Sequence, residues 1–205
     1  MFHAKPTVFV VDDDISVRES LKLFIESAGW QPETFASGRD FLAHRQAAAP
    51  SCLVLDVNLP DFSGLDLQTL VADRVDMPII FISGYGDVPM TVRAMRAGAV
   101  EFLTKPLHAD ALMRAMQHAI DRSYSELRKA ARMAELRDSF AALSRREKEV
   151  MALVVSGRLN KQVGGDLGIS EITVKAHRGK MMKKMKAGTL SDLVRMAERL
   201  HPTPI

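Results

Sequence analysis

The chain has 205 residues, of which 47% are apolar and 26% charged, a composition typical of a globular protein with room for two modest domains. Its single cysteine, Cys52, lies in an apolar run, which excludes a disulfide framework and indicates a reducing compartment. No apolar run is long enough to span a bilayer and the first residues lack an apolar signal core, so we expect a cytoplasmic protein without a membrane partner.

Charge is distributed unevenly along the chain. Residues 1–120 carry 10 basic and 15 acidic side chains, a balance of −5, whereas residues 143–205 carry 13 basic and 6 acidic side chains, a balance of +7. A basic final third predicts a separate domain that faces a polyanion. We therefore expect a first domain at 1–120, a helical linker at 121–142 and a second domain at 143–205.

Short apolar runs alternate with helix-period stretches through the first domain. This alternation predicts an α/β domain with a doubly wound parallel sheet of five βα units and helices on both faces. Asp14, just before the first helical stretch, is expected to cap that helix. The expected strands are 7–11, 33–35, 52–55, 78–82 and 100–103, and the expected helices are 16–28, 38–48, 64–73, 88–97 and a long one from 110.

The long helix continues through the predicted linker without a glycine or proline to stop it. Residues 121–138 mix both charge signs around a narrow apolar seam. Such a seam could pair with a copy of itself, or the helix could simply be solvated, and the sequence leaves both interpretations open. The seam consists of Ile120, Tyr124, Leu127, Ala131 and Ala134.

From Leu143 the pattern becomes entirely helical, with four helices expected. The second and third of these are short and joined by a tight turn, which is the pattern of a helix-turn-helix. Caps and stops mark the helices: a Ser144/Glu147 capping box and a stop at Gly157 for the first, Asn160 and Gly168 around 161–167, Ser170 and Gly188 around 171–186, and a last helix at 190–200.

Polar residues follow the predicted strands where the carboxyl ends of a parallel sheet would meet. Asp12, Asp13 and Asp56 should converge there with Ser83 and Lys105. Clustered carboxylates suit a hard divalent ion such as Mg²⁺, or Mn²⁺ in its place. Asp56 could then attack phosphorus as a carboxylate nucleophile, while Ser83 and Lys105 bind phosphoryl oxygens.

The third helix of the second domain is strongly basic. A basic helix after a tight turn can enter the major groove of DNA with its first residues leading. Its cationic side chains are Lys175, His177, Arg178, Lys180, Lys183, Lys184 and Lys186. Its apolar side chains, expected to pack against the other helices, are Ile172, Val174, Met181, Met182 and Met185.

The first domain resembles the receiver domain of two-component response regulators, which has a flavodoxin-like fold. The resemblance rests on residues 10–14, 55–60, Ser83-Gly84 and Lys105-Pro106. It implies that Asp56 accepts a phosphoryl group from a histidine kinase and that Ser83, Lys105 and Phe102 serve catalysis and the activation switch. It also implies a Mg²⁺ site formed by Asp12, Asp13, Asp56 and the backbone carbonyl of Asn58.

The second domain resembles the LuxR-type helix-turn-helix, and the whole chain is similar to the FixJ/NarL group, closest to the FixJ side. Residues 143–147, 160–161, 169–170 and 173–177 carry this similarity. It implies base-facing positions at Lys175, Ala176 and Gly179, and further DNA contacts from Asn160, Lys161, Thr173, His177, Arg178 and Lys183. The sequence departs from the family at Gly164, where alanine is usual, and the Gly164-Gly165 pair should weaken its helix by roughly 0.5–1 kcal/mol per glycine.

Together these features predict a DNA-binding transcription regulator controlled by phosphorylation, rather than a dedicated enzyme. The family suggests an activator that contacts RNA polymerase. It also suggests that phosphorylation makes the protein dimerise, and that residues 88–97 and 100–103 form the dimer interface. Two alternatives remain open: a Mg²⁺-dependent aspartyl-phosphate phosphatase, which would use the same acidic pocket, and a regulator that binds DNA independently of phosphate.

Overall fold

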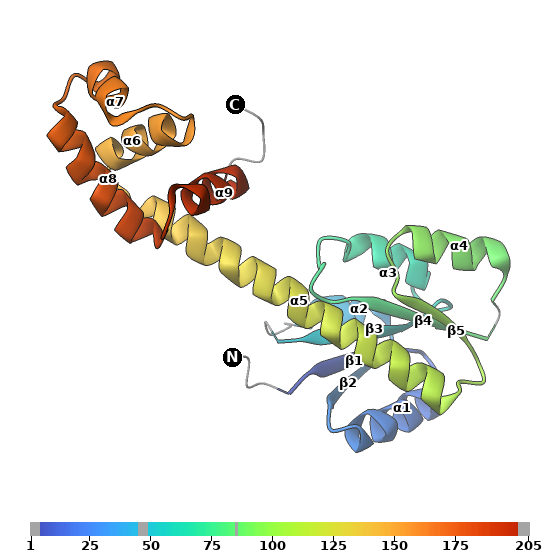
Figure 1. Ribbon diagram of the computed structural model, residues 1–205. Helices are drawn as coiled ribbons and strands as arrows, with labels where there is room; N and C mark the ends of the chain where they lie inside the picture. The colour runs from blue at the N-terminus through green and yellow to red at the C-terminus, as the bar shows by residue number, and fades with distance from the viewer. Residues whose placement is uncertain (1–4, 45–48, 85, 201–205) are drawn as a thin grey trace. The chain divides into compact units, whose positions relative to one another are not determined.

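The computed structural model describes residues 5–44, 49–84 and 86–200. It divides into two compact units, residues 1–128 and 129–205, which are treated separately below (Figure 1). In the described ranges, no helix combines the length and apolarity that a membrane crossing would require.

The first unit is built on a five-stranded sheet in which every neighbouring pair of strands is parallel. The strand order is β2-β1-β3-β4-β5, so the chain reverses its direction of travel across the sheet after β2. The bounds are β1 Thr7–Val11, β2 Gln31–Phe35, β3 Ser51–Asp56, β4 Ile79–Ser83 and β5 Glu101–Thr104.

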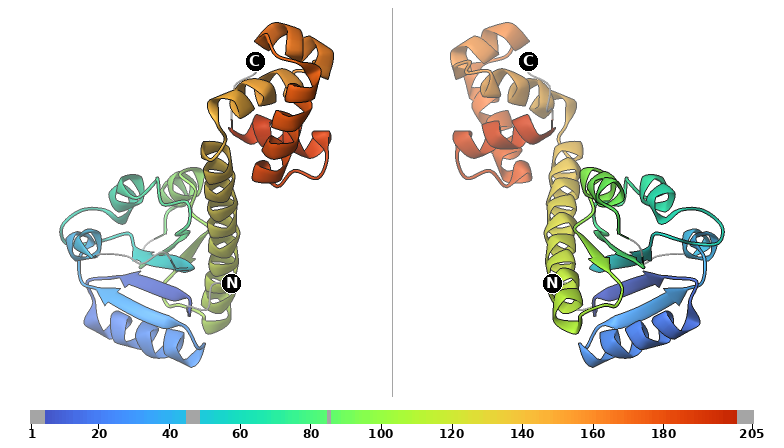
Figure 2. Two further views of the ribbon diagram at one scale, coloured as in Figure 1. Left: turned by 90° about the vertical axis from the view of Figure 1, so that its left-hand side faces the viewer. Right: turned by 90° about the vertical axis from the view of Figure 1, so that its right-hand side faces the viewer.

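Helices cover both faces of this sheet. Because side chains alternate along a strand, Phe9 and Val11 of β1 pack in one core with α2, α3 and α4, whereas Val8 and Val10 pack in the other with α1 and α5. Figure 2 shows α1 on the opposite side of the sheet from α3 and α4. The bounds are α1 Ile15–Ser27, α2 Gly38–Ala43, α3 Gly64–Leu70, α4 Val88–Arg96 and α5 Ala109–Ala141.

The predicted α/β fold with a doubly wound parallel sheet is confirmed, and two helices are shorter than expected. The α2 helix ends at Ala43 because His44 has an extended backbone and its ring pairs with Glu33 of β2 at 2.7 Å. The last predicted residues of this helix, 45–48, lie outside the described residues. The α3 helix ends at Leu70, three residues before the predicted end. Asp14 caps α1 as predicted, since its side chain accepts a hydrogen bond from the Ser16 N–H.

The α5 helix contributes to the cores of both units. Ile120 is buried in the core between the sheet and α1, with Tyr124 packed against that core, so the first two residues of the predicted seam are occupied within the first unit. Further along, Leu136 and Phe140 pack against the core of the second unit. Residues 128–132, between these two segments, are exposed.

The second unit is helical throughout its described part, as predicted. Its helices are α6 Arg145–Val155, α7 Asn160–Leu167, α8 Glu171–Met185 and α9 Leu190–Leu200. The Ser144/Glu147 capping box forms in full: Ser144 Oγ accepts from the Glu147 N–H, and Glu147 Oε2 accepts from the Ser144 N–H. Ser170 caps α8, and Gly168 ends α7 in the left-handed conformation with φ +66°.

Three local expectations in this unit were wrong. Asn160 does not cap α7 but is its first residue; the cap is Leu159, whose N–H donates to the Gln162 side chain. The α8 helix ends at Met185, one residue before the predicted end, and the residue that stops it is not Gly188 but Lys186, which takes a left-handed conformation with φ +54°. Ile172 does not join the core: its side chain is 80% exposed.

Candidate phosphoacceptor site and nucleic-acid interface

Three carboxylates meet at the carboxyl ends of β1 and β3. Asp12 and Asp13 follow β1 directly, and Asp56 is the last residue of β3. One carboxylate oxygen from each lies within 4.8 Å of the others. Asp12 is fully buried and Asp56 is 5% exposed, whereas Asp13 is exposed. These three side chains therefore lie together at the carboxyl ends of the strands, as the parallel sheet led us to expect.

Lys105, which follows β5, joins this cluster. Its Nζ donates to Asp12 Oδ2 at 2.8 Å and to Asp56 Oδ2 at 2.5 Å. Burial disfavours the ammonium, but the hydrogen bonds to Asp12 and Asp56 outweigh it, so the pKa of Lys105 is raised above its usual value. The same burial raises the pKa of Asp12 despite the hydrogen bond from Lys105.

Backbone contacts hold the loops that carry the carboxylates. Asp12 Oδ1 accepts from the Asp14 N–H at 2.9 Å, and Asp56 Oδ1 accepts from the Asn58 N–H at 3.0 Å. Arg18 was not predicted as a site residue, yet its Nη1 donates to the carbonyl oxygens of Asp12 and Asp13 at 2.7 and 2.8 Å. The sequence feature that could have identified Arg18 as a site residue is its position one turn into the helix that follows the acidic loop.

The residues present fit a divalent metal ion. All three side chains offer oxygen, which Mg²⁺ and Mn²⁺ prefer. In the described part of the chain, Lys105 is the cation paired with these carboxylates, so three acidic groups face one ammonium. A divalent ion would balance this excess of negative charge. Asn58, whose backbone carbonyl was predicted as a further ligand, is exposed beside Asp56.

The two remaining residues predicted for this site, Ser83 and Phe102, lie on β4 and β5. Ser83 ends β4 and is fully buried, and its carbonyl accepts from the Lys105 N–H at 2.8 Å, which ties the ends of β4 and β5 together. Phe102, on β5, is half-buried, with its ring centroid 6.1 Å from that of Phe81.

In the second unit, α8 exposes most of the residues predicted to contact DNA. Val174, Met181 and Met185 are buried on one side of α8, which fixes the helix against the core and leaves the opposite side free. Of the predicted residues on α8, Lys175, Ala176, Gly179 and Lys183 are exposed, and Thr173, His177 and Arg178 are half-buried. Lys161, on α7, is also exposed.

The structure brings two of the predicted DNA-contacting residues together. Arg178 Nη1 donates to Asn160 Oδ1 at 3.0 Å, so the side chain expected to cap α7 instead orients a guanidinium on α8. Lys184, by contrast, is turned toward the scaffold: its Nζ donates to Glu147 Oε2 at 2.7 Å and to the Ala142 carbonyl. The basic surface of α8 is therefore narrower than its charge run suggested.

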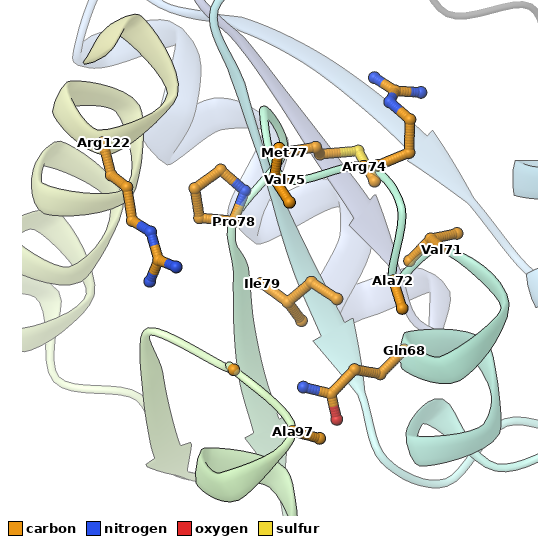
Figure 3. A pocket seen from close by; sticks show the side chains of 11 residues that line it. Gln68, Val71, Ala72, Arg74, Val75, Met77, Pro78, Ile79, Ala97 and Arg122 are labelled. Atoms are coloured by element: carbon orange, nitrogen blue, oxygen red, sulfur yellow. The ribbon is translucent and has the colours of Figure 1, made fainter. Parts of the chain in front are cut away.

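A small pocket of about 150 Å³ opens elsewhere in the first unit, near the start of β4 (Figure 3). Most of the residues that line it are apolar, and Gln68, Arg74 and Arg122 are the polar ones. Gln68 Nε2 donates to the Ala94 carbonyl, which accounts for one end of its buried amide. None of the predicted site residues lines this pocket.

Comparison with known families places both units. Residues 8–117 match the family described as "Response regulator receiver domain". Residues 141–197 match the family described as "Bacterial regulatory proteins, luxR family".

Individual relatives resemble the whole chain. Nodulation protein W of Bradyrhizobium diazoefficiens is 49% identical over 96% of this chain and 87% of its own length. Transcriptional regulatory protein FixJ of Azorhizobium caulinodans is 41% identical over 93% of this chain and 90% of its own. The solved structure of response regulator StyR has a TM-score of 0.85 at 44% identity, covering 96% of this chain and 100% of that one. The chain therefore belongs to the two-component response regulators that join a receiver domain to a LuxR-type helix-turn-helix domain, in the group that includes FixJ.

Proposed function

We propose that a partner histidine kinase phosphorylates Asp56, and that phosphorylation promotes receiver dimerisation and binding to a promoter, which the protein then activates. The observation that carries this proposal is the hydrogen bond from Lys105 to Asp56 within a cluster of three carboxylates. An ordered lysine beside a strand-end aspartate suits a site that receives a doubly charged group.

The reaction requires little chemistry from the protein beyond positioning. A carboxylate oxygen of Asp56 attacks the phosphorus of a phosphohistidine, the P–N bond breaks, and the imidazole leaves and takes up a proton. Lys105 stays beside the new acyl phosphate and pairs with one of its oxygens. Mg²⁺, when held by Asp12, Asp13 and Asp56, supplies positive charge that offsets the repulsion between the carboxylate and the phosphoryl group.

A groove beside the site supports docking of the kinase. It has a volume of about 420 Å³, is lined by residues of α1 and the first part of α5, and reaches Lys105. Ile15, at the start of α1 next to the acidic loop, is 65% exposed. A kinase that brings a phosphohistidine to Asp56 must lie against these elements, and an apolar surface there favours its association.

A second apolar surface supports dimerisation. On α4, Val88, Val92 and Met95 are 76%, 42% and 41% exposed, and Arg93 and Arg96 accompany them. Exposed apolar side chains mixed with arginine are typical of protein interfaces. A dimer would bring two copies of α8 to two DNA half-sites, and joint binding would raise the effective affinity.

The test is a titration of labelled promoter DNA with the full-length protein at fixed salt, because DNA affinity falls steeply with ionic strength. Protein treated with Mg²⁺ and acetyl phosphate should bind more tightly than untreated protein, and sedimentation should show a dimer only after treatment. Asp56→Asn should remove both effects. Asp66→Asn, which alters an exposed carboxylate on α3, is the matched control and should keep them.

Two results would contradict the proposal. Stimulation that persists in Asp56→Asn would move the control of DNA binding away from this site. Rapid multiple turnover of a phosphomonoester would instead identify a phosphatase. A receiver, once phosphorylated, should release its phosphate only slowly and so should not turn over rapidly.

A further inference from the structure

The side chain of Ile172 is the starting point. It occupies the second position of α8 and is 80% exposed, although isoleucine is usually buried. The other β-branched apolar residue of this helix, Val174, is fully buried. Single exposed apolar residues are common on protein surfaces, so exposure alone argues little, and the position of Ile172 carries the argument.

Ile172 lies on the same face of α8 as the predicted base-facing residues. Helix periodicity places Ala176 and Gly179 four and seven residues further along that face, with Lys175 beside them, and all three are exposed. Ala176 and Gly179 have almost no side chain. The backbone of α8 can therefore approach a base edge closely, and Ile172 becomes the large apolar group that projects from this surface.

Major-groove chemistry offers one apolar partner for such a group. Base edges in the groove present hydrogen-bond donors and acceptors, together with the C5-methyl group of thymine. Residues near the N-terminus of a recognition helix are the ones that reach the base edges. Ile172 meets both conditions, whereas its neighbour Glu171 is engaged with Lys175 at 3.1 Å.

We infer that Ile172 reads a thymine methyl group in each half-site of the promoter and is a specificity determinant of this protein. The inference rests on the proposed binding of promoter DNA through α8. It assigns apolar recognition to a position that charge patterning overlooks, and it compensates for Gly179, which offers no side chain for reading bases.

The experiment uses the full-length protein treated with Mg²⁺ and acetyl phosphate. Duplexes that bind the wild-type protein are selected from a random library, and each thymine of the best duplex is then replaced singly by uracil, which removes only the methyl group. At one thymine per half-site, replacement by uracil should lower the affinity of the protein for the duplex about fourfold. This is the change expected when one methyl group is removed from an apolar contact. Ile172→Ala should bind the thymine and uracil duplexes equally, and Ile172→Val should keep a reduced preference.

The matched control is Leu159→Ala, because Leu159 is 70% exposed in the same unit but lies outside α8. It should retain the fourfold methyl preference. The inference is overturned if Ile172→Ala keeps the wild-type preference at every thymine, or if the wild-type protein binds its selected duplex without sensitivity to any methyl group. Failure to select any sequence would overturn the proposed DNA binding as well, so the two failures are distinguishable.

Discussion

Two adjacent glycines in α7 should respond to the same substitution to different extents. Gly165 is exposed in the helix interior, and a Cβ added there meets no atom within 4 Å. Gly165→Ala should therefore raise the free energy of unfolding by roughly 0.5–1 kcal/mol, because alanine restricts the unfolded chain and favours the helix.

At Gly164 the same change meets the turn of the helix-turn-helix. A Cβ there would lie 2.8 Å from the carbonyl oxygen of Ile169, whose N–H donates to the Gly164 carbonyl at 3.0 Å. The turn would have to move away, and the strain should offset the gain in helix propensity. Gly164→Ala should thus stabilise the unit less than Gly165→Ala does.

Differential scanning calorimetry of the full-length protein measures both effects. For a unit of this size, the Gly165→Ala gain corresponds to an increase of about 3–6 °C in the melting temperature of the second unit. The melting of the first unit should not change. Equal increases for the two variants, or a decrease for Gly165→Ala, would refute the reasoning from local space.

Three further predictions concern buried groups. Ser123→Ala should destabilise the first unit by about 1–3 kcal/mol in urea unfolding, because Ser123 Oγ accepts from the buried Ser51 N–H at 2.9 Å, which would lose its partner. Glu147→Gln should cost the second unit about 1 kcal/mol, measured by thermal unfolding, because it loses the charged partner of Lys184. That pairing also holds the pKa of Glu147 below its usual 4.5, so its contribution is present above that pH and is lost as the pH falls further. Burial raises the pKa of the Cys52 thiol to about 12, so a thiol reagent at pH 8 should react with it only after unfolding.

Each of these has a result that contradicts it. An unchanged urea midpoint for Ser123→Ala would mean that water replaces the hydroxyl. A Glu147→Gln variant that melts at the wild-type temperature at neutral pH would show that the ion pair has no net value. Rapid labelling of native Cys52 would require the strand that carries it to open readily.

The main features of the fold followed from the sequence because they depend on local pattern. Buried parallel strands read as apolar runs, and the position of Asp12 and Asp56 at strand ends was enough to predict that they meet. Side-chain partners from distant elements left no such signal. Asn160 is of a residue type that commonly caps helices, yet its Oδ1 accepts a hydrogen bond from Arg178, eighteen residues away. The residue type of Ile172 predicted that it joins an apolar stripe, but at the first turn of α8 its side chain is 80% exposed.

Because α5 is one continuous helix, it limits where two regulators of this family can recombine their domains. Leu136 and Phe140 pack against the core of the second unit even though they precede residues 141–197, which match the LuxR family. A gene fusion that joined a foreign receiver at residue 143 would strip both side chains from the DNA-binding module and leave its core incomplete. A crossover within the exposed residues 128–132 would keep each module whole, so recombination among relatives should be tolerated best inside this helix rather than at its end.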